Sequence, residues 1–322
     1  MEKISLIIPT QNNSAKLIEL LTSISTWTLL PDQIIIVDSS EIKIEISLDF
    51  QDFCKINNIF LNIIYEKNLF PGNARNKGIA NSKYDYLAFL DINTMPNENW
   101  LKSNFTNLIN SRSHGIIGAT IYKASNSKEK IIRAATYGTR PLKTLPGSIF
   151  KKDVINRCGL FIESVRAGED QDWMVRLNLH KIQTINSKEI LTYNGLLGFN
   201  YIDILKKWFR NYYSASNLPY LRSHKDWYFY GISIVLITIA FNWNVIMTNR
   251  YASSVFYIPH ITKISVIFLT LLYIVLRGIY YPLNKGLKLN FIFPFNFLKL
   301  VALSFALDTA KLVAFIIGKL KK

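Results

Sequence analysis

Short apolar runs alternate with amphipathic stretches over roughly the first 195 residues of the chain. The clearest apolar runs, which we predict to be strands, are residues 4–8, 33–37, 61–65, 84–90 and 115–121. Helical periodicity is clearest at residues 15–25, 72–80 and 97–110. Such alternation is typical of an α/β domain with a mostly parallel sheet and helices on both faces. Ligands of such sheets bind at the carboxyl ends of the strands.

The pattern changes at residue 201, where an amphipathic helix is predicted over residues 201–218. Its apolar face contains Tyr201, Ile204, Leu205, Trp208, Phe209, Tyr212 and Tyr213, and its polar face contains Asp203, Lys206, Lys207, Arg210 and Asn211. An aromatic-rich face opposite basic residues is typical of a helix lying in a membrane interface, although a helix that packs between domains shows the same pattern. We favour the interfacial helix because a long apolar segment follows it.

Three apolar segments follow the amphipathic helix. Residues 227–249 contain no charged residue and are long enough to span a bilayer. Residues 264–283 form a second predicted span, in which Arg277 lies close enough to one end to reach the interface. Residues 297–318 contain three charges, of which Asp308 and Lys311 are spaced to form a pair. We expect this last segment to be interfacial or a third span.

Charge is distributed unevenly between the two parts of the chain. Residues 1–200 carry 23 Lys and Arg against 19 Asp and Glu, whereas residues 201–322 carry 15 against 3 and account for most of the net charge of +16. The basic residues flank apolar runs, which favours anionic lipid over nucleic acid as the partner. Basic residues at both ends of the membrane region predict an even number of spans, with both termini cytosolic.

The cysteine content and the first residues agree with a cytosolic N-terminal domain. Cys54 and Cys158 have neither disulfide-framework nor metal-ligand spacing, so we expect ordinary core thiols. The chain opens directly on a strand-like run without the features of a secretory signal. We therefore expect this domain to stay in the cytosol.

Polar residues follow two of the predicted strands. Pro9 and Thr10 come directly after the first strand, and Asp38 follows the second. A nucleobase and ribose lying across adjacent strand ends need such groups, and Asp38 can accept a hydrogen bond from either. Alternatively, these are turn residues and Asp38 caps the segment that follows. The residues alone leave both interpretations open.

A basic helix and an acidic strand end come next. Arg75 lies in a short predicted helix, where its charge can neutralise a diphosphate. An apolar strand then delivers Asp91 and Asn93 to its carboxyl end. Hard oxygen ligands at this position suit a divalent cation that bridges a diphosphate. We favour that interpretation over a helix-capping role for Asp91.

An acidic first turn opens another predicted helix at residues 168–177. Asp172 meets Arg176 at helical spacing, which indicates a structural ion pair. Asp170 instead shares a face with Trp173 and other apolar residues. An apolar wall raises the pKa of a carboxyl group, as a general base requires. The alternative role of Asp170 is to stabilise the first turn of the helix.

In this order and at these intervals, the motifs resemble those of the family 2 glycosyltransferases, which have a GT-A fold. The matching segments are Pro9-Thr10, Val37-Asp38, Ala74-Arg75-Asn76-Lys77-Gly78, Asp91-Ile92-Asn93 with Pro96 and Trp100, and Glu169-Asp170 with Arg176. The resemblance covers about residues 3–195, and the apolar C-terminal region is similar to that of membrane-associated members. It implies a Rossmann-like, mixed and mostly parallel sheet followed by an α-helical membrane region.

The resemblance also implies residue roles. It assigns nucleotide binding to Pro9, Thr10, Asp38, Arg75 and Asp91, a Mg²⁺ or Mn²⁺ ion to Asp91 and Asn93, and deprotonation of the acceptor hydroxyl to Asp170, with inversion at the sugar. The family's last Asp-x-Asp carboxylate is Asn93 here, so we expect weaker metal binding. This departure is the best argument for an alternative, a non-catalytic membrane protein that binds a nucleotide sugar or a lipid.

We therefore predict a glycosyltransferase domain in residues 1–200, an interfacial helix and linker in 201–226, and a membrane region in 227–322. The retained Asp170 favours an enzyme that moves a sugar from a nucleotide sugar, expected to be a UDP-sugar, to a lipid-linked saccharide or polyprenyl phosphate in glycan biosynthesis. A dinucleotide-dependent oxidoreductase would need a glycine-rich turn after the first strand, which the sequence lacks. We expect a multi-pass protein of the inner membrane with its catalytic domain on the cytosolic face.

Overall fold

A computed structural model describes residues 2–220, 226–247 and 253–320, and it confirms the predicted α/β domain. Its core is an eight-stranded sheet in the order β3-β2-β1-β4-β7-β6-β8-β5. The strands are β1 (Ile4–Thr10), β2 (Gln33–Asp38), β3 (Phe60–Tyr65), β4 (Tyr86–Phe89), β5 (Thr94–Met95), β6 (Gly115–Tyr122), β7 (Leu142–Lys151) and β8 (Thr184–Tyr193).

The sheet is mixed, with a parallel part that the sequence predicts well and an antiparallel part around β7. Strands β3, β2, β1 and β4 pair in parallel, and all four were expected within about two residues of their observed ends. Strand β7 pairs antiparallel with both β4 and β6. The observed order brings the ends of β1, β2 and β4 to the same edge, which is where the polar residues were predicted to gather.

Helices cover both faces of the sheet, and each face has its own apolar core. The helices of the domain are α1 (Ser14–Ile24), α2 (Leu48–Ile56), α3 (Pro71–Ala80), α4 (Trp100–Asn110), α5 (Ser127–Ala135), α6 (Asp153–Cys158) and α7 (Glu169–Leu179). Helices α1, α2 and α4 cover one face, whereas α3, α6 and α7 cover the other. Cys54 and Cys158 are buried free thiols, as predicted.

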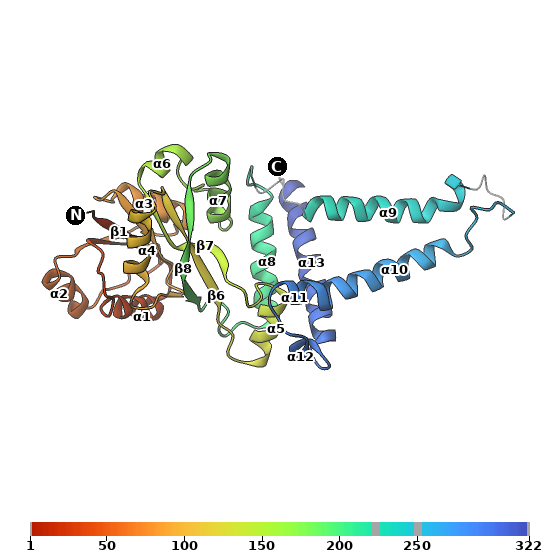
Figure 1. Cartoon of the computed structure of the whole chain (residues 1–322), viewed down its shortest axis with the longest axis horizontal. Helices are drawn as coiled ribbons and strands as arrows, with labels where there is room; N and C mark the ends of the chain where they lie inside the picture. The colour runs from red at the N-terminus through yellow and green to blue at the C-terminus, as the bar shows by residue number, and fades with distance from the viewer. Residues whose placement is uncertain (1, 221–225, 248–252, 321–322) are drawn as a thin grey trace.

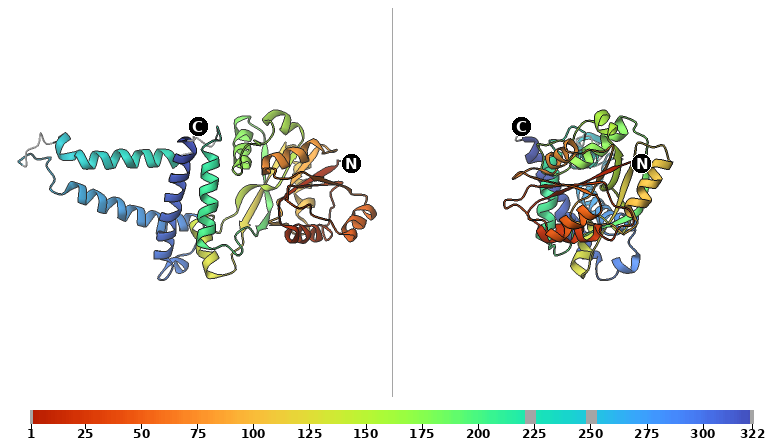
Figure 2. Two further views of the ribbon diagram at one scale, coloured as in Figure 1. Left: turned by 180° about the vertical axis from the view of Figure 1, so that it is seen from behind. Right: turned by 90° about the vertical axis from the view of Figure 1, so that its left-hand side faces the viewer.

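The C-terminal third forms two further layers, which Figures 1 and 2 show from opposite sides. Helices α8 (Tyr201–Ala215) and α13 (Phe297–Leu320) lie side by side against the domain. Helices α9 (Asp226–Met247) and α10 (Ile261–Val275) extend as a long hairpin from this layer, away from the α/β domain. The chain returns through a π-helical turn (Leu276–Tyr280), α11 (Tyr281–Asn284) and α12 (Leu289–Ile292).

Close packing joins α8 and α13. A Cβ atom added to Gly318 would lie 2.1 Å from the Ser216 Oγ atom and 3.0 Å from the Tyr213 carbonyl oxygen, so only glycine permits this approach. A third apolar cluster contains Ile132 of α5 together with Leu300 and other residues of α13. The C-terminal helix is thus part of the domain's packing and not a separate appendage.

Among the described residues, two helical stretches are long and apolar enough to cross a membrane, Ile261–Asn284 and Phe297–Leu320. The first matches the span predicted at residues 264–283. The predicted span at 227–249 coincides with α9, whose described side chains cover Ile234–Met247, while residues 248 and 249 lie outside the described residues.

Three charged residues of these helices, Arg277, Asp308 and Lys311, are paired with one another. Asp308 of α13 forms the predicted ion pair with Lys311, with 3.1 Å between Nζ and Oδ1. It also accepts hydrogen bonds from Arg277 and from Tyr273 of α10. We expected Arg277 to extend to the interface, but the structure pairs it with Asp308, because a buried carboxylate on the neighbouring helix offers stronger compensation than solvent.

Candidate active site

A cleft of about 550 Å³ lies at the carboxyl edge of the parallel strands, between the domain and α8. It is lined by strand ends, by the first turn of α7 and by one side of α8. The site residues predicted from the sequence that line it are Pro9, Thr10, Arg75, Asp91, Asn93 and Asp170. Segments far apart in sequence therefore meet where the fold predicts a ligand.

Two predicted nucleotide-binding residues at the end of β1 face the cleft. Pro9 and Thr10 both line it, and Thr10 is 3% exposed. The Thr10 hydroxyl is buried and has no hydrogen-bond partner among the described residues. An unpaired buried hydroxyl is costly unless a ligand or water completes its hydrogen bonding.

Asp38 has a different environment. Its carboxylate is 1% exposed and accepts hydrogen bonds from the backbone N–H groups of Ser40 and Ile44, at 3.0 and 2.7 Å. Asp38 is also absent from the lining of the cleft, although the neighbouring Ser39 is present. These contacts match the second interpretation of the sequence, in which Asp38 caps the segment that follows it.

Arg75 links two acidic residues of the cleft. Its guanidinium donates to Glu169 Oε1 at 2.5 Å and to Asp91 Oδ1 at 3.0 Å. The helix that carries it, α3, approaches the loop before α7 closely, because a Cβ on Gly72 would lie 2.1 Å from the Ile162 carbonyl oxygen. The Glu169 contact was not predicted, since nothing in the sequence pairs residues 94 positions apart.

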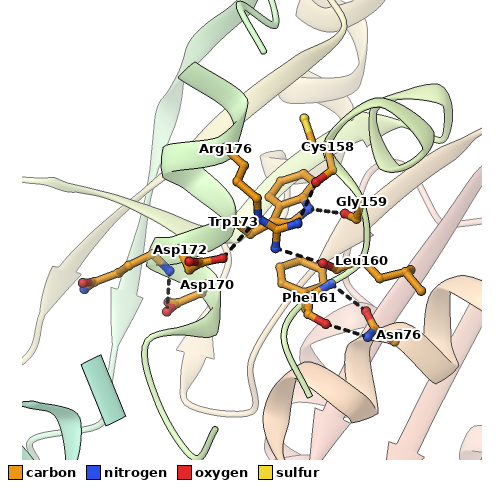
Figure 3. A network of polar contacts seen from close by, with 10 residues as sticks. Asn76, Cys158, Gly159, Leu160, Phe161, Asp170, Asp172, Trp173 and Arg176 are labelled. Atoms are coloured by element: carbon orange, nitrogen blue, oxygen red, sulfur yellow. Dashed lines mark hydrogen bonds and ion pairs between the residues drawn. The ribbon is translucent and has the colours of Figure 1, made fainter. Parts of the chain in front are cut away.

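A network of hydrogen bonds fixes the first turn of α7, as Figure 3 shows. Arg176 bonds to Asp172 Oδ2 at 3.1 Å, which confirms the predicted ion pair, and it also donates to the carbonyl oxygens of Cys158 and Leu160. Trp173 donates from its indole to the Gly159 carbonyl oxygen at 2.9 Å. The turn that carries the acidic residues is therefore held rigidly against the loop before it.

Asp170 extends from this rigid turn into the cleft. Desolvation by burial raises the pKa of Asp170, partly opposed by the charge of Arg75, and the nearby Asp91 carboxylate raises it further. Burial likewise raises the pKa of Glu169. The sequence predicted a raised pKa for Asp170, and its burial gives the same direction. A carboxyl group with a raised pKa is suited to accept a proton.

An aromatic wall, formed by Tyr122, Tyr137, Tyr193, Trp208 and Tyr212, lines the opposite side of the cleft. The rings of Tyr122 and Tyr137 stack with centroids 3.6 Å apart, and Trp208 lies 5.9 Å from Tyr137. These residues come from β6, β8, α8 and the segment after α5. Long-range topology brings them together, so no local sequence pattern identifies them.

Lys207 extends into this aromatic wall. Its Nζ atom lies 5.5–6.0 Å from the ring centroids of Tyr122, Tyr137, Tyr193 and Phe199. Desolvation, followed by the charges of Arg210 and Lys16, lowers the pKa of Lys207 to about 8. The sequence pattern placed Lys207 on the solvent face of an interfacial helix. It faces the cleft instead, because α8 packs between the domain and α13.

Comparison with known proteins identifies the domain. Residues 5–163 match the family model described as "Glycosyl transferase family 2". These residues form a family 2 glycosyltransferase domain. The chain is 25% identical over 244 residues to pre-mycofactocin glycosyltransferases from two strains of Mycobacterium tuberculosis, a match that covers 69% of this chain. It covers 48% of theirs, so the chain spans about half the length of these curated relatives.

Two solved structures are similar to this chain. The mannosyltransferase PcManGT from Pyrobaculum calidifontis, in complex with GDP-Man and Mn²⁺, superposes with a TM-score of 0.54 at 12% identity, covering 96% of this chain and 87% of that one. S. aureus TarS 1–349 superposes with a TM-score of 0.46 at 14% identity, covering 95% and 91%. The mannosyltransferase likeness establishes a GT-A fold for the glycosyltransferase domain.

The cation-binding residues expected in a glycosyltransferase of this fold are already engaged by other groups. Asp91 Oδ1 accepts from Arg75, and Asn93 Oδ1 accepts from the Lys16 ammonium group at 2.5 Å. In the part of the chain that the structure describes, no three His, Cys, Asp or Glu residues lie where they could hold a metal ion. This donor set does not fit a divalent cation, which prefers several free anionic oxygens.

Proposed function

We propose that the protein is an inverting glycosyltransferase that moves a sugar from a nucleotide-sugar donor to a lipid-linked acceptor at a membrane surface. The observation that carries this proposal is Asp170, which projects from a rigid helical turn into a cleft at the strand ends of a family 2 domain. A UDP-sugar is the expected donor. The structure of the similar mannosyltransferase PcManGT, which contains GDP-Man, supports a nucleotide sugar in general.

Thr10 and Arg75 bind the donor in this proposal. The unpaired hydroxyl of Thr10 at the end of β1 is available to the nucleotide. Arg75 lines the cleft, and its ion pairs with Asp91 and Glu169 fix the guanidinium group in one position, from which its remaining N–H groups can donate to a diphosphate. Both residues sit on regular elements, which hold a donor in a defined position.

Asp170 acts on the acceptor. It takes the proton from an acceptor hydroxyl, whose oxygen attacks the anomeric carbon from the face opposite the departing nucleoside diphosphate. The bond to the diphosphate oxygen breaks as the new glycosidic bond forms, so the configuration inverts. The raised pKa of Asp170 makes it a better proton acceptor than an exposed aspartate.

The other end of the cleft supports an acceptor with an apolar part. Trp208, Tyr212 and Ala215 of α8 and Phe315 of α13 line it there. The hairpin of α9 and α10 leaves the same layer and exposes apolar side chains along its length. A lipid-linked saccharide or polyprenyl phosphate held in a bilayer can reach this end with its head group.

The same geometry supports a membrane location. The hairpin spans the bilayer in our proposal, while α8 and α13, which run across it, lie near the cytosolic surface together with the catalytic domain. The protein is then a multi-pass component of the inner membrane. The excess of Lys and Arg in residues 201–322 favours contact with anionic lipid on that side.

A thermal-shift panel of UDP- and GDP-sugars tests the proposal with detergent-solubilised protein. We expect at least one nucleotide sugar to raise the unfolding temperature by several degrees, because a ligand at about 100 times its Kd adds about 2.7 kcal/mol of stability. Thr10→Val should weaken the shift, while Thr28→Val, on an exposed loop, should leave it unchanged. Stabilisation without sugar turnover would instead favour the non-catalytic binding protein.

A further inference from the structure

Lys16 and Asn93 form a contact at the cleft, and neither residue has a role in the proposed reaction above. Lys16 lies in the first turn of α1, directly after the end of β1, and its backbone N–H donates to the Asn13 side chain that caps the helix. Its ammonium group donates to Asn93 Oδ1, and Asn93 lines the cleft. Lys16 forms no ion pair with a carboxylate in the described ranges, so its charge is not compensated there.

The surroundings of this contact favour an anion. The N-terminus of α1 is the positive end of an eleven-residue helix and follows a strand at the sheet's ligand-binding edge. The Thr10 hydroxyl, 3% exposed and unpaired among the described residues, lies in the lining of the same cleft. Lys207 is near enough for the charge of Lys16 to lower its pKa. The Thr10 hydroxyl and Lys207 thus line the cleft, and Lys16 is connected to it through Asn93.

We infer that Lys16, held by Asn93, supplies the positive charge that a divalent cation supplies in cation-dependent glycosyltransferases. The inference rests on the proposed function. A carboxylate at position 93 would attract a metal ion. The neutral amide of Asn93 instead accepts a hydrogen bond from the ammonium group of Lys16, which belongs to the chain itself. The diphosphate of the donor then binds Lys16 directly, and this protein binds its nucleotide without a divalent cation.

Lys16 in this role neither forms nor breaks a covalent bond. The bond between the anomeric carbon and the diphosphate oxygen breaks, and its electron pair leaves with the nucleoside diphosphate. The acceptor oxygen forms the new bond, and its proton passes to Asp170. Lys16 remains protonated throughout and stabilises the charge that builds up on the leaving group.

Isothermal titration calorimetry with UDP and with GDP, in buffer containing EDTA or MnCl₂, tests the inference on the full chain. We expect the better-bound nucleotide to bind wild-type protein with about the same affinity in both buffers. Lys16→Ala should weaken binding in EDTA about tenfold or more, because a charge-assisted contact to phosphate is lost. Lys102→Ala removes the same charge from an exposed position on α4 and should bind as wild type.

A double variant tests the exchange of lysine for metal. Lys16→Ala combined with Asn93→Asp should bind the nucleotide weakly in EDTA and recover affinity in MnCl₂, since an aspartate restores the missing anionic ligand. Wild-type binding that requires MnCl₂, or full affinity in EDTA for Lys16→Ala, would overturn the inference and leave the proposed function intact. Absence of binding of either nucleotide in both buffers would overturn both.

Discussion

Apolar residues are used in opposite ways in strand β2 and helix α10. All six residues of β2 are buried between two layers of helices. Helix α10 is equally rich in apolar residues, yet none of its residues is buried, and Phe268 is 63% exposed. A water-soluble protein rarely exposes such a continuous apolar surface, and this difference supports our proposal that lipid covers the hairpin.

The layer of α8 and α13 lies between these two regions and shares properties of both. Its buried residues, such as Ile204 and Leu300, join the packing of the domain. Its aromatic side chains Trp208, Tyr212 and Phe315 line the cleft, and the hairpin lies on its side away from the domain. In our proposal, the strand ends therefore recognise a water-soluble donor, and this layer contacts a lipid-bound acceptor.

The largest change in stability should come from a buried charge in the domain. Arg75→Met leaves Asp91 and Glu169 without their shared cation, and removing one partner of a buried ion pair typically costs about 3–5 kcal/mol. Differential scanning fluorimetry in detergent should show a lower unfolding temperature for Arg75→Met. Lys55→Met breaks an exposed pair with Asp52 and should change it little. Equal decreases in unfolding temperature for the two variants would mean that the ion pairs of Arg75 are not desolvated.

A pair of apolar truncations tests the comparison directly. Ile35→Ala in β2 should cost about 2–5 kcal/mol of stability, because it leaves a cavity in a packed core. Phe268→Ala in α10 should cost under about 1 kcal/mol in detergent, since the side chain contacts detergent and not protein. Chemical or thermal unfolding of both variants provides the measurement. A comparable loss for Phe268→Ala would show that protein, not lipid, covers the hairpin.

The pH dependence of donor binding should show the smallest effect. The pKa of Lys207 is lowered to about 8, so Lys207 loses its charge, and its attraction for an anionic substrate, as the pH rises through that value. An arginine stays charged throughout this range, so Lys207→Arg should keep nucleotide affinity between pH 7 and about pH 9. The matched exposed variant Lys206→Arg should follow the wild-type curve. Identical curves for all three proteins would remove Lys207 from the binding site.

The sequence predicts the elements near the ligand edge better than it predicts their partners. Strand ends at Thr10 and Asp91 follow from short apolar runs, and Asp172 pairs with Arg176 within one helical turn, so local patterns suffice. The contact of Lys16 with Asn93 depends on the order of strands in the sheet, and the contact of Lys207 with Tyr137 depends on how α8 packs against the domain. Helical periodicity also cannot distinguish a membrane surface from a packing partner, which is why both an interfacial helix and a domain-packing helix fit the sequence of α8.

The same limit applies to the last helix. Residues 297–318 read as a span or an interfacial segment, and by length and composition Phe297–Leu320 passes as a span. The structure adds that Gly318 packs against α8 and that Asp308 pairs with Arg277. Neither contact has a local sequence signature, since each joins residues from distant parts of the chain.

Turnover by Asp170→Asn tests the central claim most directly. The variant keeps the shape of the side chain and removes its ability to accept a proton. Sugar released or transferred from the donor identified by thermal shift should fall by a factor of about 10² or more, while calorimetric nucleotide binding stays unchanged. Asp52→Asn, on the exposed face of α2, should retain full turnover. Wild-type turnover by Asp170→Asn would contradict the account, because the cleft would then work without its proposed base.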